Sequence, residues 1–314
     1  MVQFLLRRLF LILFILFTIS LLIFAVTEIL PGDAAAMILG QQATPETLAA
    51  LRIRLGLDQP AYLRYLQWIG GVLRGDWGES LVMNLPVGPI LAQRLRNSLT
   101  LGVLALLIGT PLGILGGVIA GLNQGRWADR SITIFTIFTV SFPSFVTAIF
   151  LIILLASWLR WLPASSLIPP DANLWESARY LVLPVLTLVL GLLAHITRHT
   201  RSSLIEVLGS DYLRTAVSKG LPQRLVLIRH ALRNALLPTI SVVALNVGWL
   251  LSGVVLVESV FAYPGLGRLM LQAINSRDIP LLQAVMLVIA AIYAFTNLAA
   301  DLCYRWLNPR IRYS

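Results

Sequence analysis

Six stretches of this chain are apolar, and all but the short fourth one have about the length that a helix needs to cross a membrane. The hydrocarbon core of a bilayer is about 30 Å thick, and a helix rising about 1.5 Å per residue crosses it in about 20 residues. The first stretch follows Arg7 and Arg8 and is longer than the roughly 7–15 apolar residues of a signal peptide, so we expect an uncleaved membrane helix. The third is long enough to tilt or to break at Pro143. The predicted membrane helices cover residues 9–26, 99–122, 132–159, 181–194, 239–257 and 281–302.

The composition and the distribution of charge agree with a membrane protein. Only 12% of the residues are charged, against about 25% in soluble domains, and 58% are hydrophobic. The net charge of +10 would suit nucleic acid, but the basic residues flank the apolar stretches, and 14 of the 24 fall in the four segments on one side. Because cytoplasmic loops are enriched in Lys and Arg, we expect both termini in the cytoplasm and no nucleic-acid partner. The predicted fold is an all-α polytopic membrane protein with six transmembrane helices.

Three segments are expected outside the membrane on the other side: residues 31–96, 163–179 and 258–280. The first has a soluble composition, and its Thr44-Pro45 pair suits the start of a helix that is expected to end at Gly56. It is too long for a tight turn, so we expect a small extracytoplasmic region. The predicted parts are a first helix (1–30), this region (31–96), a five-helix core (97–306) and a cytoplasmic tail (307–314).

Glycines recur every four residues along the second predicted membrane helix. On a helix such a row forms one face with almost no side chains, which allows another helix to pack closely. A smooth wall for a solute path is the alternative interpretation. The residues are Gly109, Gly113, Gly117 and Gly121.

The motifs of common enzymes are missing from the sequence. A phosphate-binding P-loop needs Lys followed by Ser or Thr, but the single lysine, Lys219, is followed by Gly220. His195 and His199 lie four residues apart and could share a helix face, but no acid or cysteine stands at ligand spacing. We therefore expect no metal site, no bound cofactor and no catalytic residues in this chain.

Polar residues inside membrane spans are candidates for a translocation path. Acidic residues at mid-span are typical of ion coupling, and here Glu28, Glu258 and Asp301 all fall near the ends of spans. This argues against a proton-coupled secondary transporter, although a secondary transporter or channel stays an alternative. Hydrogen bonds between helices would explain the asparagines equally well. The candidates are Ser141, Asn246, Ser252, Glu258 and Asn297.

The longest basic segment between apolar stretches is a hairpin within residues 200–238. We expect a first helix at about 210–219, a left-handed stop at Gly220, and a second helix that starts at Pro222 and ends at Pro238. An amphipathic helix lying on anionic lipid is the alternative. The Gly/Pro break favours a rigid protrusion that contacts a protein partner.

This hairpin resembles the EAA loop of permease subunits of binding-protein-dependent ABC importers, in the version of the dipeptide, oligopeptide and nickel branch. Asp211 stands where the pattern has an acidic residue, Gly220 matches its glycine, and Leu213 replaces one of its small residues. The segment from Arg229 to Pro238 continues the pattern. Further matches in the family's order are Phe4 to Arg8, Pro31-Gly32-Asp33, Leu55-Gly56-Leu57-Asp58, Gly75-Asp76-Trp77-Gly78, Pro264-Gly265-Leu266-Gly267 and Asn308-Pro309-Arg310.

The resemblance implies a type I ABC importer permease core in a prokaryotic cytoplasmic (inner) membrane. It implies four kinds of partner: a second related permease, two cytoplasmic ATPase subunits that use ATP and Mg, an extracytoplasmic solute-binding protein, and the lipid bilayer. The implied substrates are short peptides, with nickel or glutathione as alternatives. Residues 211–220 would be the coupling helix that receives the ATPase motion, through Asp211, Tyr212, Arg214, Thr215, Ala216, Lys219 and Gly220.

Overall fold

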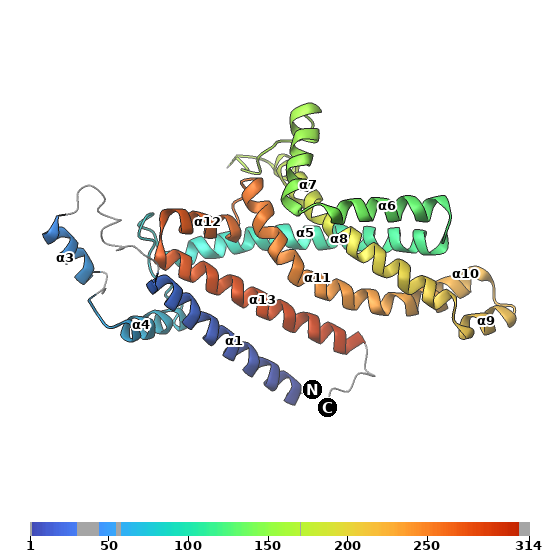
Figure 1. Cartoon of the computed structure of the whole chain (residues 1–314), viewed down its shortest axis with the longest axis horizontal. Coiled ribbons are helices and arrows are strands. Elements are labelled where there is room, and N and C mark those ends of the chain that lie inside the picture. The colour runs from blue at the N-terminus through green and yellow to red at the C-terminus, as the bar shows by residue number, and fades with distance from the viewer. Residues whose placement is uncertain (1, 30–43, 55–57, 170, 308–314) are drawn as a thin grey trace. The chain divides into compact units, whose positions relative to one another are not determined.

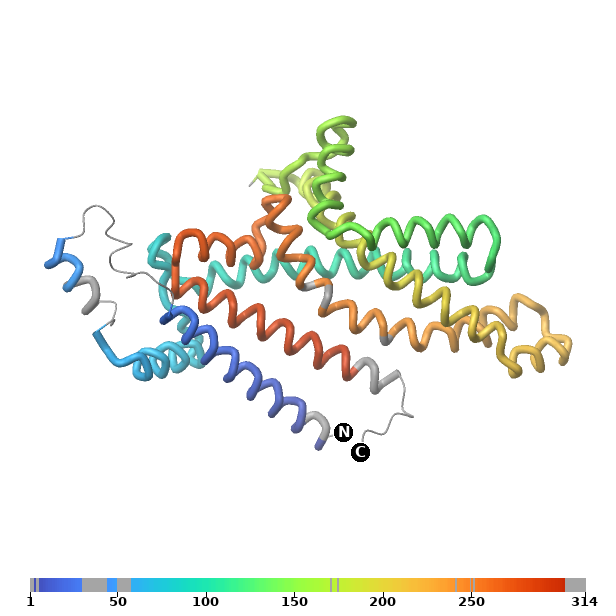
Figure 2. Tube along the Cα trace, viewed as in Figure 1, coloured from blue at the N-terminus to red at the C-terminus, as the bar shows by residue number. Residues whose placement is uncertain are grey.

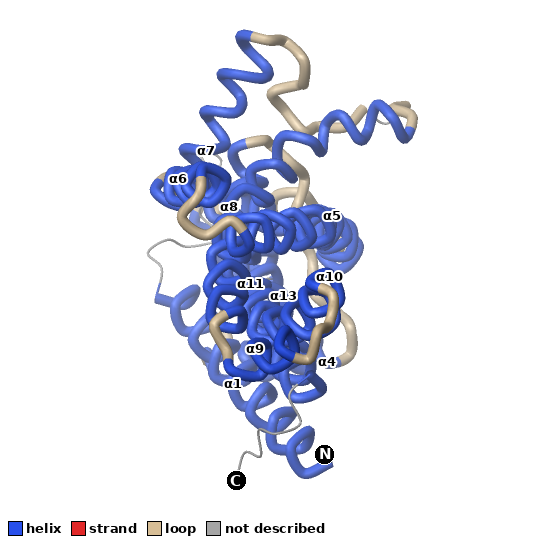
Figure 3. Tube along the Cα trace, turned by 90° about the vertical axis from the view of Figure 1, so that its right-hand side faces the viewer, coloured by secondary structure: helices blue, strands red, loops and turns tan. Residues whose placement is uncertain are grey.

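The computed structural model describes residues 2–29, 44–54, 58–169 and 171–307. Over these ranges the regular structure is helical, apart from one isolated β-bridge between Glu79 and Pro86 (Figure 3). The chain divides into two compact units, and Figure 1 labels the helices of the chain. Unit 1 comprises residues 1–97 and 264–295, and unit 2 comprises residues 98–263 and 296–314.

Unit 1 contains the first helix and the region that follows it. Thr44 caps a helix as expected, since its Oγ1 accepts a hydrogen bond from Thr47 N at 3.2 Å. The expected end of that helix at Gly56 lies outside the described residues. The helices are α1 (Val2–Ile29), α3 (Pro45–Arg54), α4 (Ala61–Leu73), the first turns of α5 (Val87–Leu122), α12 (Leu266–Ser276) and most of α13 (Ile279–Leu307).

Polar contacts join separate segments of unit 1. Ser20 of α1 and Tyr65 of α4 are hydrogen-bonded through their hydroxyls at 2.9 Å. Asp278, which lies between α12 and α13 and is fully buried, accepts hydrogen bonds from the Ser80 hydroxyl and from Leu81 N at 3.2 Å. A buried carboxylate needs such donors because an unpaired charge inside a protein is costly.

Unit 2 holds most of the predicted core. Its helix α8 is central: an apolar cluster joins it to α5, α7 and α11. The elements of unit 2 that follow α5 are α6 (Trp127–Ser141), α7 (Ser144–Leu151), the π-helix η2 (Ile152–Trp158), α8 (Leu174–Leu208), α9 (Asp211–Ser218), α10 (Gln223–Leu225), the π-helix η3 (Val226–Leu232) and α11 (Arg233–Val260).

The third predicted span breaks at Pro143, as the sequence allowed. Proline lacks an N–H group and disfavours a helical conformation in the preceding residue, and here Phe142 is extended (φ −103°, ψ 136°). The two halves of the span meet at a bend of 105°. Five other helices are long and apolar enough to cross a membrane, so with this bent pair the described residues contain up to six spans, in agreement with the sequence.

Two expectations about the extent of elements were wrong. The fourth predicted span, 181–194, is part of the 35-residue helix α8, which continues through Pro184. Residues 258–280 were expected to be a loop, but they contain α12. Apolar contacts along a membrane helix outweigh the loss of one hydrogen bond at a proline, whose freed backbone group neighbouring groups can satisfy.

Candidate functional site

The predicted coupling helix is α9, which the structure places at the end of α8 (Figures 1 and 2). Ser210 is its N-cap residue and Lys219 its C-cap, so the helix has the bounds expected from the sequence. Gly220 follows with φ +77° and open space around the position of a Cβ atom. That left-handed conformation is the helix stop that the sequence predicted, and it strains any residue other than glycine.

One face of α9 packs against the rest of unit 2. Leu213 is 3% exposed and Ala216 is 9% exposed. They belong to an apolar cluster with buried residues of α8, η3 and α11, namely Leu204, Val226, Ala231 and Ala235. Ala216 was predicted as a coupling residue, and the structure places it in this cluster, where a larger side chain would push α9 away.

Tyr212 ties α9 to the second arm of the hairpin. Its hydroxyl accepts a hydrogen bond from Asn234 Nδ2 at 2.9 Å and is within 3.4 Å of the carbonyl oxygen of His230, to which it donates. The short helix is therefore held both by apolar packing and by polar contacts.

The other predicted coupling residues form a solvent-exposed face of α9. Asp211 and Arg214 form an ion pair at 3.6 Å along the helix, with side chains that are 97% and 76% exposed. Thr215, Lys219 and Gly220 are exposed as well. We call these five residues the polar face of α9; they are chemically available to a partner.

The second arm of the hairpin differs from the expectation. Pro222 precedes a helix, as predicted, but the helix does not end at Pro238. It runs through α10 and η3 directly into α11 and on to Val260. Because no loop intervenes between them, the second arm of the hairpin and α11 are one continuous helical element.

An ion pair near this hairpin was not recognised from the sequence as a site. Asp129 in the first turn of α6 is 4% exposed and accepts two hydrogen bonds from Arg201 of α8, from Nε at 2.5 Å and from Nη2 at 2.8 Å. Gly125 N donates to the same carboxylate at 2.8 Å, and the Thr133 hydroxyl donates at 3.3 Å. The available signal was a single acid in a short loop flanked by two arginines, Arg126 and Arg130.

The glycine row on α5 lies directly against α8, and we call this contact the α5–α8 seam. A Cβ atom added at Gly113 would lie 2.8 Å from Ile196 Cβ, and one added at Gly117 would lie 2.8 Å from the carbonyl oxygen of Thr197. Thr197 Oγ1 also donates to the Gly113 carbonyl oxygen at 3.0 Å. Gly109 lies against Leu192 and Gly121 against Leu204 in the same way. Close helix packing is the role that this geometry shows, rather than an open wall.

The proposed path residues have diverse surroundings. Asn246 Nδ2 donates to Val242 O at 2.8 Å and Ser141 Oγ donates to Ile137 O at 2.8 Å, so both are hydrogen-bonded within their own helices. Ser252 is exposed and Asn297 is half-buried. Glu258 is fully buried and accepts a hydrogen bond from Ser98 Oγ at 2.5 Å. Their place on a path stays a prediction.

Glu258 also influences Tyr263, which lies three residues beyond the end of α11. Tyr263 N donates to the Glu258 carbonyl oxygen at 2.8 Å. Burial, and to a smaller extent the charge of Glu258, raise the pKa of the Tyr263 phenol to about 12. Tyr263 is therefore a neutral hydroxyl at physiological pH, next to a buried carboxylate.

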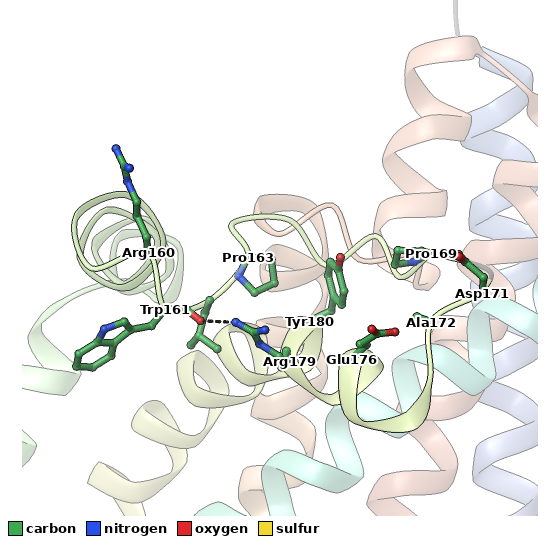
Figure 4. A pocket seen from close by; sticks show the side chains of 10 residues that line it. Arg160, Trp161, Pro163, Pro169, Asp171, Ala172, Glu176, Arg179 and Tyr180 are labelled. Carbon is green, nitrogen blue, oxygen red and sulfur yellow. Dashed lines mark hydrogen bonds between the residues drawn. The ribbon is translucent and has the colours of Figure 1, made fainter.

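An open cavity of about 560 Å³ lies where the segment after η2 meets the start of α8 (Figure 4). Two of its four charged side chains are hydrogen-bonded to backbone groups. Glu176 accepts from Asn173 N at 3.0 Å in the capping box of α8, and Arg179 Nη2 donates to Trp161 O at 2.9 Å. The cavity is therefore formed by the connection between η2 and α8 and by the first turns of α8. Within the described residues, no group of three or more His, Cys, Asp or Glu could hold a metal ion.

Two regions of the chain match known protein families. Residues 113–313 match the family described as "Binding-protein-dependent transport system inner membrane component". Residues 1–94 match the family of the N-terminal part of such membrane components.

Relatives of the same length carry related names. The chain is 37% identical to the "Probable peptide ABC transporter permease protein y4tP" of Sinorhizobium fredii, over 99% of both chains. It is also 37% identical to the "Dipeptide transport system permease protein DppB" of Escherichia coli K12, over 100% of this chain and 99% of that protein.

Two solved structures show the same fold. One is an amino acid ABC transporter with histidines (TM-score 0.52, 16% identity). The match covers 71% of this chain and 94% of the solved chain. The other is the inward-facing MetNI methionine ABC transporter (TM-score 0.54, 14% identity), which covers 69% and 96%. Together with the helical membrane fold and the hairpin, these matches show that the chain belongs to the family of inner membrane components of binding-protein-dependent transport systems.

Proposed function

We propose that this chain is one of two related permease subunits that form the pore of an ATP-driven importer of short peptides. The observation that carries the proposal is α9: a short helix with an exposed polar face, fixed to the transmembrane helices by Leu213, Ala216 and Tyr212. A helix built in this way can receive a push from a protein partner and pass it on. The names of the full-length relatives support peptides as substrate.

The energy for transport comes from partner subunits in this proposal. The chain has no P-loop, so two cytoplasmic ATPase subunits bind Mg and ATP and contact the polar face of α9. Their closure on ATP displaces α9 and switches the pore. The proposal places α9, both termini and the tail 307–314 in the cytoplasm, in line with the basic residues there.

A solute-binding protein delivers the peptide on the opposite side of the membrane. The segment 31–96 is the proposed extracytoplasmic region, with α4 anchored to α1 through Tyr65 and Ser20. The binding protein selects the substrate, so nickel or glutathione import would use the same permease architecture. The alternative function is that of a secondary transporter or channel, in which transport would not depend on ATP.

The test reconstitutes the chain in liposomes with a related permease, two ATPase subunits and a peptide-binding protein. ATP-dependent accumulation of labelled di- and tripeptides is expected, together with its loss when the binding protein is omitted. Peptide accumulation without ATPase subunits would contradict the proposal. Accumulation of nickel or glutathione in place of peptides would retain the mechanism and replace the substrate.

A variant in the hairpin tests the coupling role. Gly220→Val forces a β-branched residue into a left-handed conformation and distorts the end of α9, so uptake is expected to fall while the protein stays in the membrane. Gly75→Val is the matched control, because Gly75 has φ +85° and open space at its Cβ position but lies in unit 1. Equal uptake by the two variants would remove the coupling role from Gly220.

A further inference from the structure

The Asp129–Arg201 ion pair joins the start of α6 to the last turns of α8. Both segments lie on the side of unit 2 where α9 lies. Asp129 begins α6 just after the turn at 123–126, and Arg201 is two turns before the end of α8. Both carboxylate oxygens are engaged by the guanidinium, which gives a fixed relative orientation as well as attraction. With Asp129 4% exposed, water competes little for these contacts.

The same part of α8 also contacts the two other helices around it. Thr197 donates to the Gly113 carbonyl oxygen of α5 at 3.0 Å, and Ser203 Oγ donates to the Ala235 carbonyl oxygen of α11 at 2.9 Å. Residues 197 and 201 are four apart, so they share one face of α8, while 203 points to another. Over two turns, α8 is thus attached to α5, to the start of α6 and to α11.

The link from α8 to α9 is short and hydrogen-bonded. α8 ends at Leu208 and α9 starts at Asp211. Gly209 N donates to Ile205 O at 3.1 Å, and Ser210 Oγ donates to Val207 O at 2.5 Å. A displacement of α9 is therefore transmitted to α8 through a short connection that is held by hydrogen bonds.

We propose that Asp129 and Arg201 are positioning residues of the transport cycle: their ion pair makes the α5–α6 turn and the start of α6 move with α8 whenever α9 is displaced. The inference rests on the proposed coupling role of α9. Without the ion pair, displacement of α9 moves α8 while α6 does not follow, and the pore switches incompletely. The ion pair stays closed throughout the cycle, as a strut and not as a gate.

The experiment measures peptide transported per ATP hydrolysed by the reconstituted complex. Asp129→Asn and Arg201→Gln are each expected to lower this ratio by about tenfold, within the range of typical coupling energies, while ATP hydrolysis continues. Arg201→Lys keeps the charge but loses the two-pronged geometry, so a smaller decrease is expected. Glu28→Gln breaks an ion pair with Arg64 in unit 1 and serves as the matched control, with an unchanged ratio.

A covalent replacement distinguishes a strut from a gate and covers the case in which the single variants do not assemble. Asp129→Cys and Arg201→Cys are combined with Cys303→Ser in a complex otherwise free of cysteine, and the pair is linked with a short bifunctional thiol reagent. Transport per ATP at the wild-type level in the linked complex supports the strut. Failure of the linked complex to transport, or wild-type ratios in the single variants, overturns it. Failure of the wild-type complex to transport would instead reject the proposed function.

Discussion

The α5–α8 seam and the α9 hairpin lie in the same unit and differ in what surrounds their residues. In the seam, backbone approaches backbone: Gly113 and Gly117 leave no room for a methyl group. In the hairpin, one face of α9 is buried through Leu213 while the opposite face, with Arg214, is open. The seam is suited to transmit a displacement because it cannot be compressed, and the hairpin is suited to receive one because half of it is free.

This difference predicts that stability and transport respond separately to substitutions. Changes in the seam or on the buried face of α9 should lower stability first. Changes to the exposed side chains of the polar face of α9 should lower transport and leave stability intact. The following variants test that separation, from the largest expected loss of stability to the smallest.

The largest loss is expected from Leu213→Ala. Leu213 is 3% exposed, and truncating a buried leucine costs about 2–5 kcal/mol because a cavity remains. Since few contacts hold α9, the loss should appear as local opening, with faster hydrogen exchange in α9 and faster tryptic cleavage after Arg214 and Lys219. Val217→Ala, at a side chain that is 54% exposed, is the control and should leave both rates unchanged. Equal protection of α9 in both variants would show that the apolar cluster does not hold it.

Next comes Gly117→Ala in the seam. The added Cβ would lie 2.8 Å from the Thr197 carbonyl oxygen, and backbone cannot move aside as a flexible side chain can. Overpacking of this kind costs about 1–3 kcal/mol. A lower midpoint of thermal unfolding in detergent would check it.

Gly102→Ala is the control for the seam variant, because its Cβ would lie 3.9 Å from Leu250, an ordinary contact. Its unfolding midpoint should match the wild type. If Gly117→Ala also matches the wild type, α5 and α8 are not packed as closely as the structure has them.

A third, smaller loss is expected from Tyr212→Phe. The variant removes a hydroxyl that accepts from Asn234 and donates to the His230 carbonyl oxygen, and a net hydrogen bond contributes about 0.5–1.5 kcal/mol. Asn234→Ala should have a similar effect, and the double variant should cost less than the sum because the two share a contact. Hydrogen exchange of α9 measures all three, and strict additivity would show that the contact contributes nothing.

The sequence predicted the polar hairpin better than its surroundings. The bounds of the helix from Asp211 to Lys219 and its stop at Gly220 could be predicted because glycine and proline set the local backbone conformation themselves, independently of distant contacts. The sequence did not predict that α11 continues through Pro238 or that α8 continues through Pro184, because packing against other helices decides whether a proline ends a membrane helix.

The contact between Asp129 and Arg201 lay beyond local reasoning for a different reason. The two residues are 72 positions apart, and the sequence pattern of neither segment indicates which residue it contacts. The glycine row, in contrast, predicted a close helix contact correctly in kind, since four glycines at fixed spacing create a flat face whichever helix covers it. What the row did not reveal is that the covering helix is α8.

The smallest effect on stability, and the sharpest test of the separation, is expected from Arg214→Ala. Its ion pair with Asp211 is almost fully exposed to solvent, and such pairs contribute little. The unfolding midpoint and the exchange of α9 should equal those of the wild type. ATP-driven uptake in the reconstituted complex should nevertheless fall, because Arg214 belongs to the face of α9 that we propose the ATPase contacts. Thr18→Ala in α1, a change to an exposed side chain that donates a hydrogen bond to the Phe14 carbonyl oxygen of its own helix, is the control and should alter neither quantity. If Arg214→Ala preserves uptake as fully as it preserves stability, the polar face of α9 is not the surface that the ATPase uses.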